Sequence, residues 1–517
     1  MLPSAAQADE IQRDAADLRR SMRITLWSYV LRIATPVLLI IVIRLYGAGP
    51  YGVFAVVTAI LTFLMRVTLL GLDKGLLWWL PRQPPGHPRA GLGAVLALTS
   101  ITSSVAAVVV ALALAPWLAA WAERPEAVTT LRWMAVSLLP MSLSEVFIHA
   151  CAARRRPEAQ IVIKDGLVPV LTAGLAVGFH FAGVGPAGLG LAHTLGVTVG
   201  LGALLWLFAR AYVDTSWDRT TKWLPPPELL RAARPLWFAD LLATALTRLD
   251  LYMLAALSDP VTAGLYQGAL QIAQNALAVR GAFDSLVAVL VAEIQLRGDL
   301  TRLIHGFSHA LGLVALVVVP LAAFIFAGAG WILPLLGAEF VQGESAVWIL
   351  TAFFAVHGTL GMNQQILIGS GRGAWVPIDA AVAMAIGVAA FTVLVPQLGL
   401  TGAALANGMM YLALSLLYIV QARQILGVWP YDRGIVALFA LSGAASLVMA
   451  ALWFALQPAL GPWARVAGFL GFVAVFTPGA FRLRRAAVTG AASVASVASA
   501  ASVASVASVA TSAPPVP

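Results

Sequence analysis

Charged side chains are scarce in this chain of 517 residues, where Asp, Glu, Lys and Arg together make up 11%. A soluble domain carries about 25%. Hydrophobic residues make up 60%, and the mean hydropathy is +0.89. A soluble core cannot bury this much apolar surface, so the sequence predicts an all-α polytopic membrane protein.

Several signatures of chemistry are also missing. Cys151 is the single cysteine, which excludes an internal disulfide and a cysteine-based metal pair. No Gly-Lys dipeptide occurs, so a P-loop is excluded. No two aspartates are spaced i,i+2, as in the Asp-x-Asp metal site of many sugar transferases, and no His/Cys spacing suits a metal. We therefore expect no metal, no other cofactor and no enzymatic activity.

Apolar windows of roughly 20 residues predict about fourteen membrane spans. The first twenty residues lack an apolar run, so we expect no cleaved signal peptide. The expected spans are 24–43, 51–71, 91–115, 129–150, 161–182, 187–209, 236–257, 262–284, 305–328, 345–368, 375–395, 400–424, 434–456 and 462–480.

These spans divide the chain into six segments. The first lobe covers residues 24–209 and the second covers residues 236–424, each with six helices. A cytoplasmic N-terminal segment (1–23) precedes them, a cytoplasmic linker (210–235) joins them, and two extra helices (425–485) follow. The low-complexity Ala/Ser/Val tail (486–517) is expected to be disordered in the cytoplasm rather than a fifteenth helix.

The basic residues follow the positive-inside rule when both termini are placed in the cytoplasm. Of the 32 Lys and Arg residues, 24 then lie in cytoplasmic segments, four lie in or beside outer loops, and four lie within spans. The net charge of +9 therefore marks the cytoplasmic face, and no nucleic-acid partner is needed to explain it. The outer loops are short, which leaves no room for an outer catalytic domain.

An internal repeat links the two lobes. Residues 44–60 (RLYGAGPYGVFAVVTAI) resemble residues 256–272 (ALSDPVTAGLYQGALQI), and residues 188–193 (GLGLAH) resemble residues 402–407 (GAALAN). The first match pairs Gly52 with Gly264, at nearly the same offset as the second match. Six spans return the chain to the same side, so the repeats are parallel and predict two lobes around a central cavity.

Four arginines interrupt the predicted spans: Arg32, Arg66, Arg248 and Arg280. Each would cost roughly 2.5–3.5 kcal/mol at the centre of a bilayer, so we expect them to line a polar cavity that binds an anion. A buried structural role remains open for each of them. Arg66 shares a face with Thr62 and Asp73 and could instead snorkel to the interface.

The remaining intramembrane polar residues leave further alternatives open. Asp284 follows Arg280 at i+4, which favours a local ion pair. Asp240 lies two turns from Arg248 on the same face, whereas Asp250 points about 160° away. Either aspartate could carry a coupling ion or pair with an arginine. Glu145 and His149, also at i,i+4, are expected to form a polar pair or a proton relay.

Five segments, in order, resemble bacterial polysaccharide-unit flippases of the multidrug/oligosaccharidyl-lipid/polysaccharide exporter superfamily. No single motif is specific for this family, but the order and spacing of all five over residues 20–425 are specific. The five segments are residues 44–82 (RLYGAGPYGVFAVVTAILTFLMRVTLLGLDKGLLWWLPR), 248–273 (RLDLYMLAALSDPVTAGLYQGALQIA), 333–350 (LPLLGAEFVQGESAVWIL), 366–377 (ILIGSGRGAWVP) and 396–412 (PQLGLTGAALANGMMYL).

The resemblance implies a flippase that moves a polyprenyl-pyrophosphate-linked oligosaccharide across the bacterial cytoplasmic membrane for surface polysaccharide, such as lipopolysaccharide. It implies a lipid-linked anionic glycan as substrate, membrane lipid as surroundings, and H⁺ or Na⁺ as candidate coupling ion. A glycan polymerase is a candidate partner. In the multidrug branch, acidic residues in the first helix of the second half, here Asp240 and Asp250, look like the coupling position.

Two other functions remain open at the level of sequence. A cation-coupled multidrug exporter of the same superfamily would need an acidic, aromatic cavity, and the excess of arginine over carboxylate argues against it. A membrane sugar polymerase or transferase would need a large outer loop or catalytic carboxylates, and neither is seen.

Overall fold

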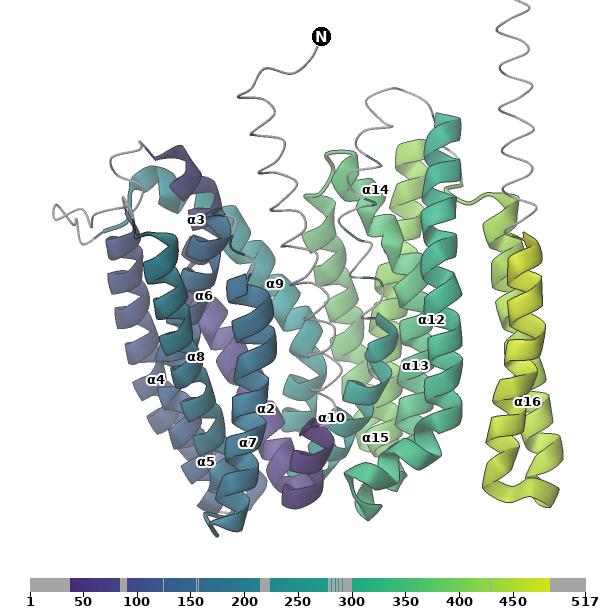
Figure 1. The fold of residues 1–517 in the computed structure, drawn as a ribbon, viewed down its shortest axis with the longest axis horizontal. Helices are drawn as coiled ribbons and strands as arrows, with labels where there is room; N and C mark the ends of the chain where they lie inside the picture. Colours follow the sequence, from purple (N-terminus) through teal and green to yellow (C-terminus); the bar gives the residue numbers. More distant parts are fainter. Residues whose placement is uncertain are drawn as a thin grey trace, which may run out of the picture. The chain divides into compact units, whose positions relative to one another are not determined.

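The computed structural model describes residues 38–83, 91–123, 125–154, 156, 158–213, 224–277, 280, 284, 287, 291, 300–427 and 429–483. These parts of the chain are built of helices (Figure 1). Arg32, the N-terminal segment and the Ala/Ser/Val tail lie outside the described residues. The main helices are α2 (Ala48–Leu69), α3 (Leu72–Trp79), α4 (Leu92–Ala122), α5 (Pro125–Val136), α6 (Leu138–Ala153), α7 (Val168–Phe181), α8 (Ala187–Ala211), α9 (Pro227–Leu257), α10 (Pro260–Ala273), α12 (Leu300–Leu336), α13 (Glu344–Leu360), α14 (Gln364–Gly369), α15 (Trp375–Leu426) and α16 (Arg433–Leu460).

Within the described residues, nine helical segments are long and apolar enough to cross a membrane. Two of them, Trp375–Leu426 and Arg433–Leu483, have 52 and 51 residues. At 1.5 Å per residue each is more than twice as long as the roughly 30 Å bilayer core. Both contain a glycine with φ 53°, Gly399 and Gly461, where the chain turns. The polytopic fold is confirmed, and the total of fourteen spans stays a prediction.

Helix α9 starts earlier than the hydrophobic pattern predicts. The sequence places residues up to 235 in a polar linker, whereas α9 begins at Pro227 and contains Pro235 in its interior. A proline suits the first helical position because its missing N–H needs no partner there. The following Glu228 lies in the first turn, where a carboxylate is favoured by the helix dipole. Because these residues are charged or proline, hydropathy alone did not predict the first two turns of α9.

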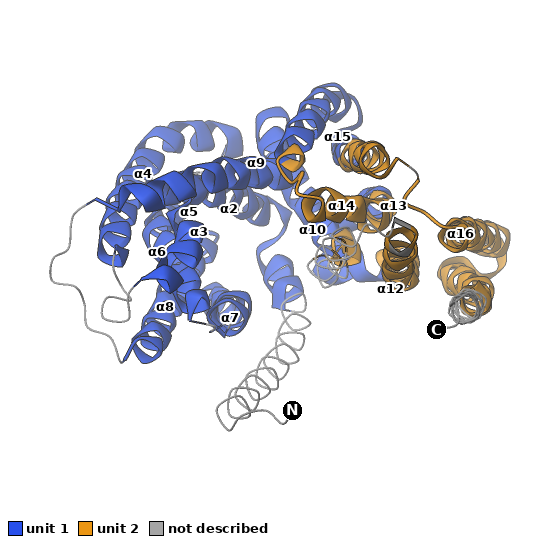
Figure 2. Cartoon of the chain, turned by 90° about the horizontal axis from the view of Figure 1, so that it is seen from above, with its two compact units in different colours: residues 1–272, 330–350, 377–410 blue, residues 273–329, 351–376, 411–517 orange. Residues whose placement is uncertain are grey.

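The chain forms two compact units, coloured separately in Figure 2. Unit 1 contains Met1–Ile272, Gly330–Leu350 and Pro377–Met410, and unit 2 contains Ala273–Ala329, Thr351–Val376 and Tyr411–Pro517. Unit 1 thus holds α9 and α10 together with the helices of the first predicted lobe. The lobe boundaries derived from the repeat stay a prediction.

The two glycines that align in the repeat meet inside unit 1, where α2 and α10 cross. A Cβ atom on Gly52 would lie 1.8 Å from the carbonyl oxygen of Pro260. A Cβ atom on Gly264 would lie 1.9 Å from the carbonyl oxygen of Ala48. Gly52 therefore packs against the carbonyl of Pro260, four residues before Gly264. Gly264 packs in the same way against the carbonyl of Ala48, four residues before Gly52. This reciprocal contact is what a two-fold relation between α2 and α10 produces, and it uses the small-xxx-small spacing of tightly packed membrane helices.

Candidate functional site

Arg66 lies at the centre of an ionic cluster in unit 1. Its guanidinium lies 3.4 Å from Asp73 of α3 and 3.4 Å from Glu145 of α6. It also lies 3.3 Å from Asp240 of α9. The Arg66 side chain is only 16% exposed, and Asp73 is 1% exposed. Arg66 and Asp73 are in contact, but they lie on two helices, α2 and α3, rather than on one face of a single helix as their spacing predicted. Two further carboxylates reach the same guanidinium from other helices.

Two lysines complete the cluster. Lys74 bonds to Asp240, and Lys164 bonds to Glu145. We call Arg66, Asp73, Lys74, Glu145, Lys164 and Asp240 the ionic cluster. Its three cations balance its three carboxylates, which is how charges remain tolerable away from water.

Local backbone features bring these side chains together. Helix α2 ends at Leu69, and Leu70 and Gly71 then adopt the left-handed conformation, so the helix is interrupted before α3 begins at Leu72. A Cβ atom on Gly71 would lie 2.6 Å from the carbonyl oxygen of Ala233, so α9 approaches this turn closely. Trp237 of α9 donates a hydrogen bond to the Arg66 carbonyl at 3.0 Å. The turn therefore holds α9, and with it Asp240, against Arg66.

Lys164 comes from a π-helix, η2 (Ala159–Leu167), that leads into α7. π-Helical turns are rare and occur often at functional positions. Lys164 and Glu145 lie on different helices, so a helical wheel cannot predict their contact. The pKa of the Asp73 carboxyl is raised above its usual value. Burial is the largest cause, and the nearby Glu145 adds to it, whereas His149 and Arg66 act in the opposite direction.

His149 lies beside the ionic cluster but does not form the side-chain pair that its spacing suggested. Its Nδ1 bonds to the Glu145 backbone carbonyl at 2.8 Å, not to the carboxylate. Asp73, Glu145 and His149 place ligand atoms within 4.8 Å of one another, as a metal site would. Arg66 and Lys164 already engage the two carboxylates of this group. A metal would have to displace these cations, so the residues fit an ionic cluster better.

Arg248 of α9 contrasts with Arg66. Its side chain is half-buried, and it makes no hydrogen bond or ion pair within the described parts of the chain. Tyr51, Asp250 and Tyr252 lie close enough to interact with its charge. Asp240, which shares its helix face, is bound to Arg66 and Lys74 instead. Of the four arginines predicted within spans, three lie in the described residues. Among these three, only Arg248 has no hydrogen-bond or ion-pair partner there.

Asp250 is buried in a separate polar site of unit 1. Its Oδ2 accepts hydrogen bonds from Tyr266 of α10 and Asn407 of α15, each at 3.0 Å. Asn407 also donates to the Tyr266 hydroxyl at 2.8 Å. Asp250 and Asn407 are each 2% exposed. Both partners lie in the repeat segments (256–272 and 402–407), but the sequence comparison gave neither of them a role as a partner of Asp250.

Arg280 is enclosed by partners in unit 2. The predicted ion pair with Asp284 is confirmed at 3.2 Å. Arg280 also donates to His357 Nε2 at 3.0 Å and to Gln364 at 3.0 Å. Since Nε2 accepts, Nδ1 of His357 carries the proton and donates to Ser415 at 2.8 Å. The structure therefore gives each of the three guanidinium nitrogens of Arg280 a protein partner without a substrate.

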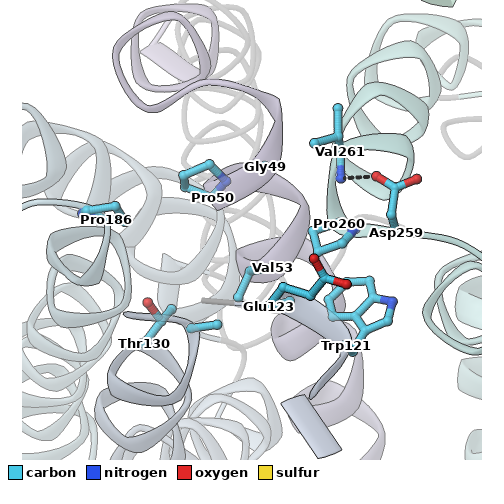
Figure 3. A pocket seen from close by; sticks show the side chains of 12 residues that line it. Gly49, Pro50, Val53, Trp121, Glu123, Thr130, Pro186, Asp259, Pro260 and Val261 are labelled. Carbon is cyan, nitrogen blue, oxygen red and sulfur yellow. Dashed lines mark hydrogen bonds between the residues drawn. The ribbon is translucent and has the colours of Figure 1, made fainter. Parts of the chain in front are cut away.

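A pocket of about 340 Å³ lies where several helix ends of unit 1 meet (Figure 3). Trp121 and Glu123 line it from the end of α4, and Pro260 lines it from the start of α10. Asp259 also lines it but is used to cap α10 through the amides of Val261 and Thr262. Partial burial raises the pKa of Asp259, but hydrogen bonds from Thr262 and Val261 outweigh it and hold the pKa below its usual value.

A family profile described as "Polysaccharide biosynthesis protein" matches residues 41–342. Comparison with curated protein sequences gives no significant match. Among solved structures, the chain is similar to the lipid II flippase MurJ in an inward closed conformation. The TM-score is 0.72 at 11% identity, covering 90% of this chain and 100% of that one.

Two further solved structures have the same fold. One is an inward-facing multidrug resistance transporter of the MATE family in the MOP superfamily. Its TM-score is 0.61 at 15% identity, covering 77% of this chain and 98% of that one. The other is a MOP superfamily transporter from Pyrococcus furiosus described as having a binding pocket of reverse polarity. Its TM-score is 0.55 at 18% identity, covering 80% of this chain and 95% of that one.

These likenesses establish a multi-pass transporter fold, and the family profile covers more than half of the chain. The resemblance read from the five sequence motifs is thereby confirmed. The chain belongs to the polysaccharide biosynthesis protein family and has the fold of the MOP superfamily transporters.

Proposed function

We propose that this protein flips a polyprenyl-pyrophosphate-linked oligosaccharide across the bacterial cytoplasmic membrane for surface polysaccharide synthesis. Arg248 carries the proposal. It is a predicted intramembrane arginine without a carboxylate partner among the described residues, so its charge calls for an anionic ligand. The polysaccharide family and the likeness to a lipid II flippase support the same substrate class.

The transport step follows from the chemistry of such a substrate. A guanidinium matches phosphate oxygens with two parallel hydrogen bonds, so Arg248 would hold the diphosphate while the sugars occupy polar space beside it. Arg32 would be a second contact. Arg66 and Arg280 are weaker candidates for binding the substrate, because both already have carboxylate partners in the protein. The lipid tail stays in the bilayer, and two parallel lobes rocking about the site would provide alternating access with both termini cytoplasmic.

Reversing the charge of Arg248 is expected to abolish surface glycan. Arg248→Glu repels the diphosphate, whereas Arg248→Lys keeps the charge but loses the paired hydrogen bonds. A hydrogen bond to a charged group contributes about 1.5–3 kcal/mol, so we expect Arg248→Lys to lower flipping by roughly 10- to 100-fold. Complementation of a strain that lacks the protein, with immunoblots of membrane fractions, provides the measurement. Normal glycan from both Arg248→Glu and Arg32→Glu would contradict the proposal.

Asp250 is the better candidate for coupling to H⁺ or Na⁺. Asp240 is bound by two cations, whereas Asp250 accepts hydrogen bonds only from neutral groups, Tyr266, Asn407 and its neighbouring amide. A buried carboxylate with neutral partners can bind a proton or a small cation without first breaking an ion pair. The ion gradient or the membrane potential, about 2.3 kcal/mol per charge per 100 mV, would then drive the cycle.

Asp250→Asn is expected to remove the dependence of transport on an ion gradient, because the amide keeps the shape but cannot bind a cation as a carboxylate does. Flipping of a fluorescent lipid-linked oligosaccharide in proteoliposomes, with imposed Na⁺ or H⁺ gradients, measures this. Asp259→Asn is the control, since that aspartate caps α10 outside the spans. If Asp250→Asn still responds to both gradients as the unaltered protein does, Asp250 is not the coupling residue.

A cation-coupled multidrug exporter is the second candidate. The likeness to a multidrug transporter and the buried carboxylate of Asp250 favour it. A cationic drug, however, would meet the unpaired guanidinium of Arg248. The gene neighbourhood separates the two functions: neighbouring glycosyltransferase or glycan polymerase genes favour the flippase, and a neighbouring drug-responsive regulator favours the exporter.

A further inference from the structure

The pocket of about 340 Å³ in unit 1 joins four segments that the sequence predicts on the outer side of the membrane (Figure 3). These segments are the connections between predicted spans at residues 44–50, 116–128, 183–186 and 258–261. Each contributes at least one lining residue. Ligand pockets in proteins measure about 300–1,000 Å³, so this one has room for one small molecule. The predicted topology places it on the outer side.

The pocket is lined by negative charge. Glu123 and Asp259 are its charged lining residues, and none of the lining residues is basic. The Asp259 carboxylate accepts hydrogen bonds from the amides of Val261 and Thr262. The Glu123 carboxylate, in contrast, makes no hydrogen bond or ion pair within the described residues, and the neighbouring Arg124 lies outside them. A cationic ligand can therefore pair with Glu123 without displacing a described protein group.

The helix starts around the pocket offer few donors to an anion. Helix N-termini attract anions through free N–H groups. Here Pro50 lies in the first turn of α2, Pro186 directly precedes α8, and Pro260 begins α10. Proline has no N–H, and the first amide of α2, from Ala48, already donates to Glu339 at 2.6 Å. An anionic ligand would thus meet two acidic side chains and few donors.

Trp121 supplies a fixed aromatic ring in the same pocket as Glu123 (Figure 3). Its ring stacks on that of Trp117, with centroids 5.8 Å apart and planes 3° apart. Its Nε1 donates a hydrogen bond to the Ser258 carbonyl at 2.6 Å. Cations bind to the faces of aromatic rings, and tryptophan binds them best. An indole held in place and a carboxylate with no described partner are together suited to an ammonium ion.

We propose that this pocket binds a small organic ammonium ion, with its charge at Glu123 and its apolar groups against Trp121 and the prolines. The ligand is distinct from the proposed lipid-linked substrate, because it is a cation and its site does not include Arg248. A neutral sugar would leave the charge of the pocket uncompensated. A bare metal ion would gain nothing from the apolar lining. Both alternatives are outcomes of the test.

Choline is the probe, and dimethylbutanol is its matched neutral analogue, in which carbon replaces the quaternary nitrogen. Radiolabelled choline is bound to the purified full-length protein in detergent, and unlabelled compounds compete with it. We expect saturable binding, with dimethylbutanol competing about ten-fold or more weakly than choline, because it keeps the shape but loses the ion pair and the cation–π contact. Non-saturable binding, or competition by dimethylbutanol, glucose or Na⁺ as strong as that by choline, would overturn the proposal.

Two variants locate the binding site. Glu123→Gln removes the charge from an exposed side chain and should weaken choline binding about ten-fold or more. Trp121→Leu removes the aromatic ring and should weaken it several-fold. Glu228→Gln is the matched control, because Glu228 is also exposed but lies about 45 Å along α9 from Ser258. Unchanged binding in Glu123→Gln, or an equal loss in Glu228→Gln, would mean that choline does not bind at this pocket.

Val261→Lys tests the site by supplying an ammonium group from the protein itself. Val261 lines the pocket and is 43% exposed, so a longer side chain can be accommodated. We expect the new lysine to occupy the site and to lower choline binding as strongly as Glu123→Gln, with an unchanged thermal unfolding temperature. Val261→Met, of similar length but uncharged, is the control. Equal choline binding by the two Val261 variants would contradict the assignment of the ammonium site to this pocket.

Discussion

Replacing Arg66 with leucine is expected to destabilise the protein by about 3–5 kcal/mol, the cost of breaking a buried ion pair on one side. The substitution leaves Asp73, 1% exposed, without a cation in hydrogen-bond distance among the described residues. His149 Nδ1, at 3.8 Å, is the nearest remaining group that can carry a charge. Thermal unfolding of the purified protein in detergent measures the loss.

Neutralising the carboxylate of Asp73, which loses its cation in Arg66→Leu, should restore part of this stability. Arg66→Leu combined with Asp73→Asn removes both charges, and residues in one ionic network couple by about 0.5–3 kcal/mol. We therefore expect the double variant to unfold at a higher temperature than Arg66→Leu alone. Additive effects of the two changes would mean that Arg66 and Asp73 do not interact in the folded protein.

Arg248→Leu provides the matched control, because Arg248, like Arg66, is a predicted intramembrane arginine and lies in unit 1. Arg248 has no described ion-pair partner, so its loss should leave the unfolding temperature unchanged while abolishing transport. Arg66→Leu should lower the unfolding temperature. If the two variants behave alike in both measurements, the distinction between a structural and a substrate-binding arginine is wrong.

Contacts along a single helix were predictable from the sequence. The spacing of Arg280 and Asp284 indicated an ion pair, and the pair is present. The helical wheel also placed Asp250 away from Arg248, and Asp250 indeed bonds to Tyr266 and Asn407. These inferences succeeded because α-helical geometry fixes which residues of one helix share a face.

Contacts between helices were not predictable in the same way. Asp240 binds Arg66, although the two residues are 174 positions apart, and Arg280 contacts His357, 77 positions away. Neither pairing follows from spacing, because it depends on how α2 meets α9 and how Arg280 meets α13. Lys164 was missed for the same reason, since its partner Glu145 lies on another helix. The sequence therefore identified the charged residues but not their partners, which decide whether an arginine is structural.

Gly52→Ala is expected to be strongly destabilising, although it adds one methyl group. The new Cβ would lie 1.8 Å from the Pro260 carbonyl oxygen and 2.7 Å from the Gly264 amide nitrogen. Both atoms belong to the backbone of α10, so the helices must separate. Overpacking costs typically about 1–3 kcal/mol, and we expect at least the upper end because no side chain can rotate away. Thermal unfolding of the purified protein measures the effect.

Gly178→Ala in α7 and Gly202→Ala in α8 are matched controls, because a Cβ atom at either position has no neighbour within 4 Å. Alanine favours a helix over glycine by up to about 1 kcal/mol, so these variants should be neutral or slightly more stable. Gly264→Ala should resemble Gly52→Ala, since its Cβ meets the Ala48 carbonyl at 1.9 Å. The double variant should cost less than the sum, because one separation of α2 from α10 relieves both clashes. If Gly52→Ala unfolds like Gly178→Ala, then α2 and α10 do not cross at these glycines, and the reciprocal contact between the repeats is absent.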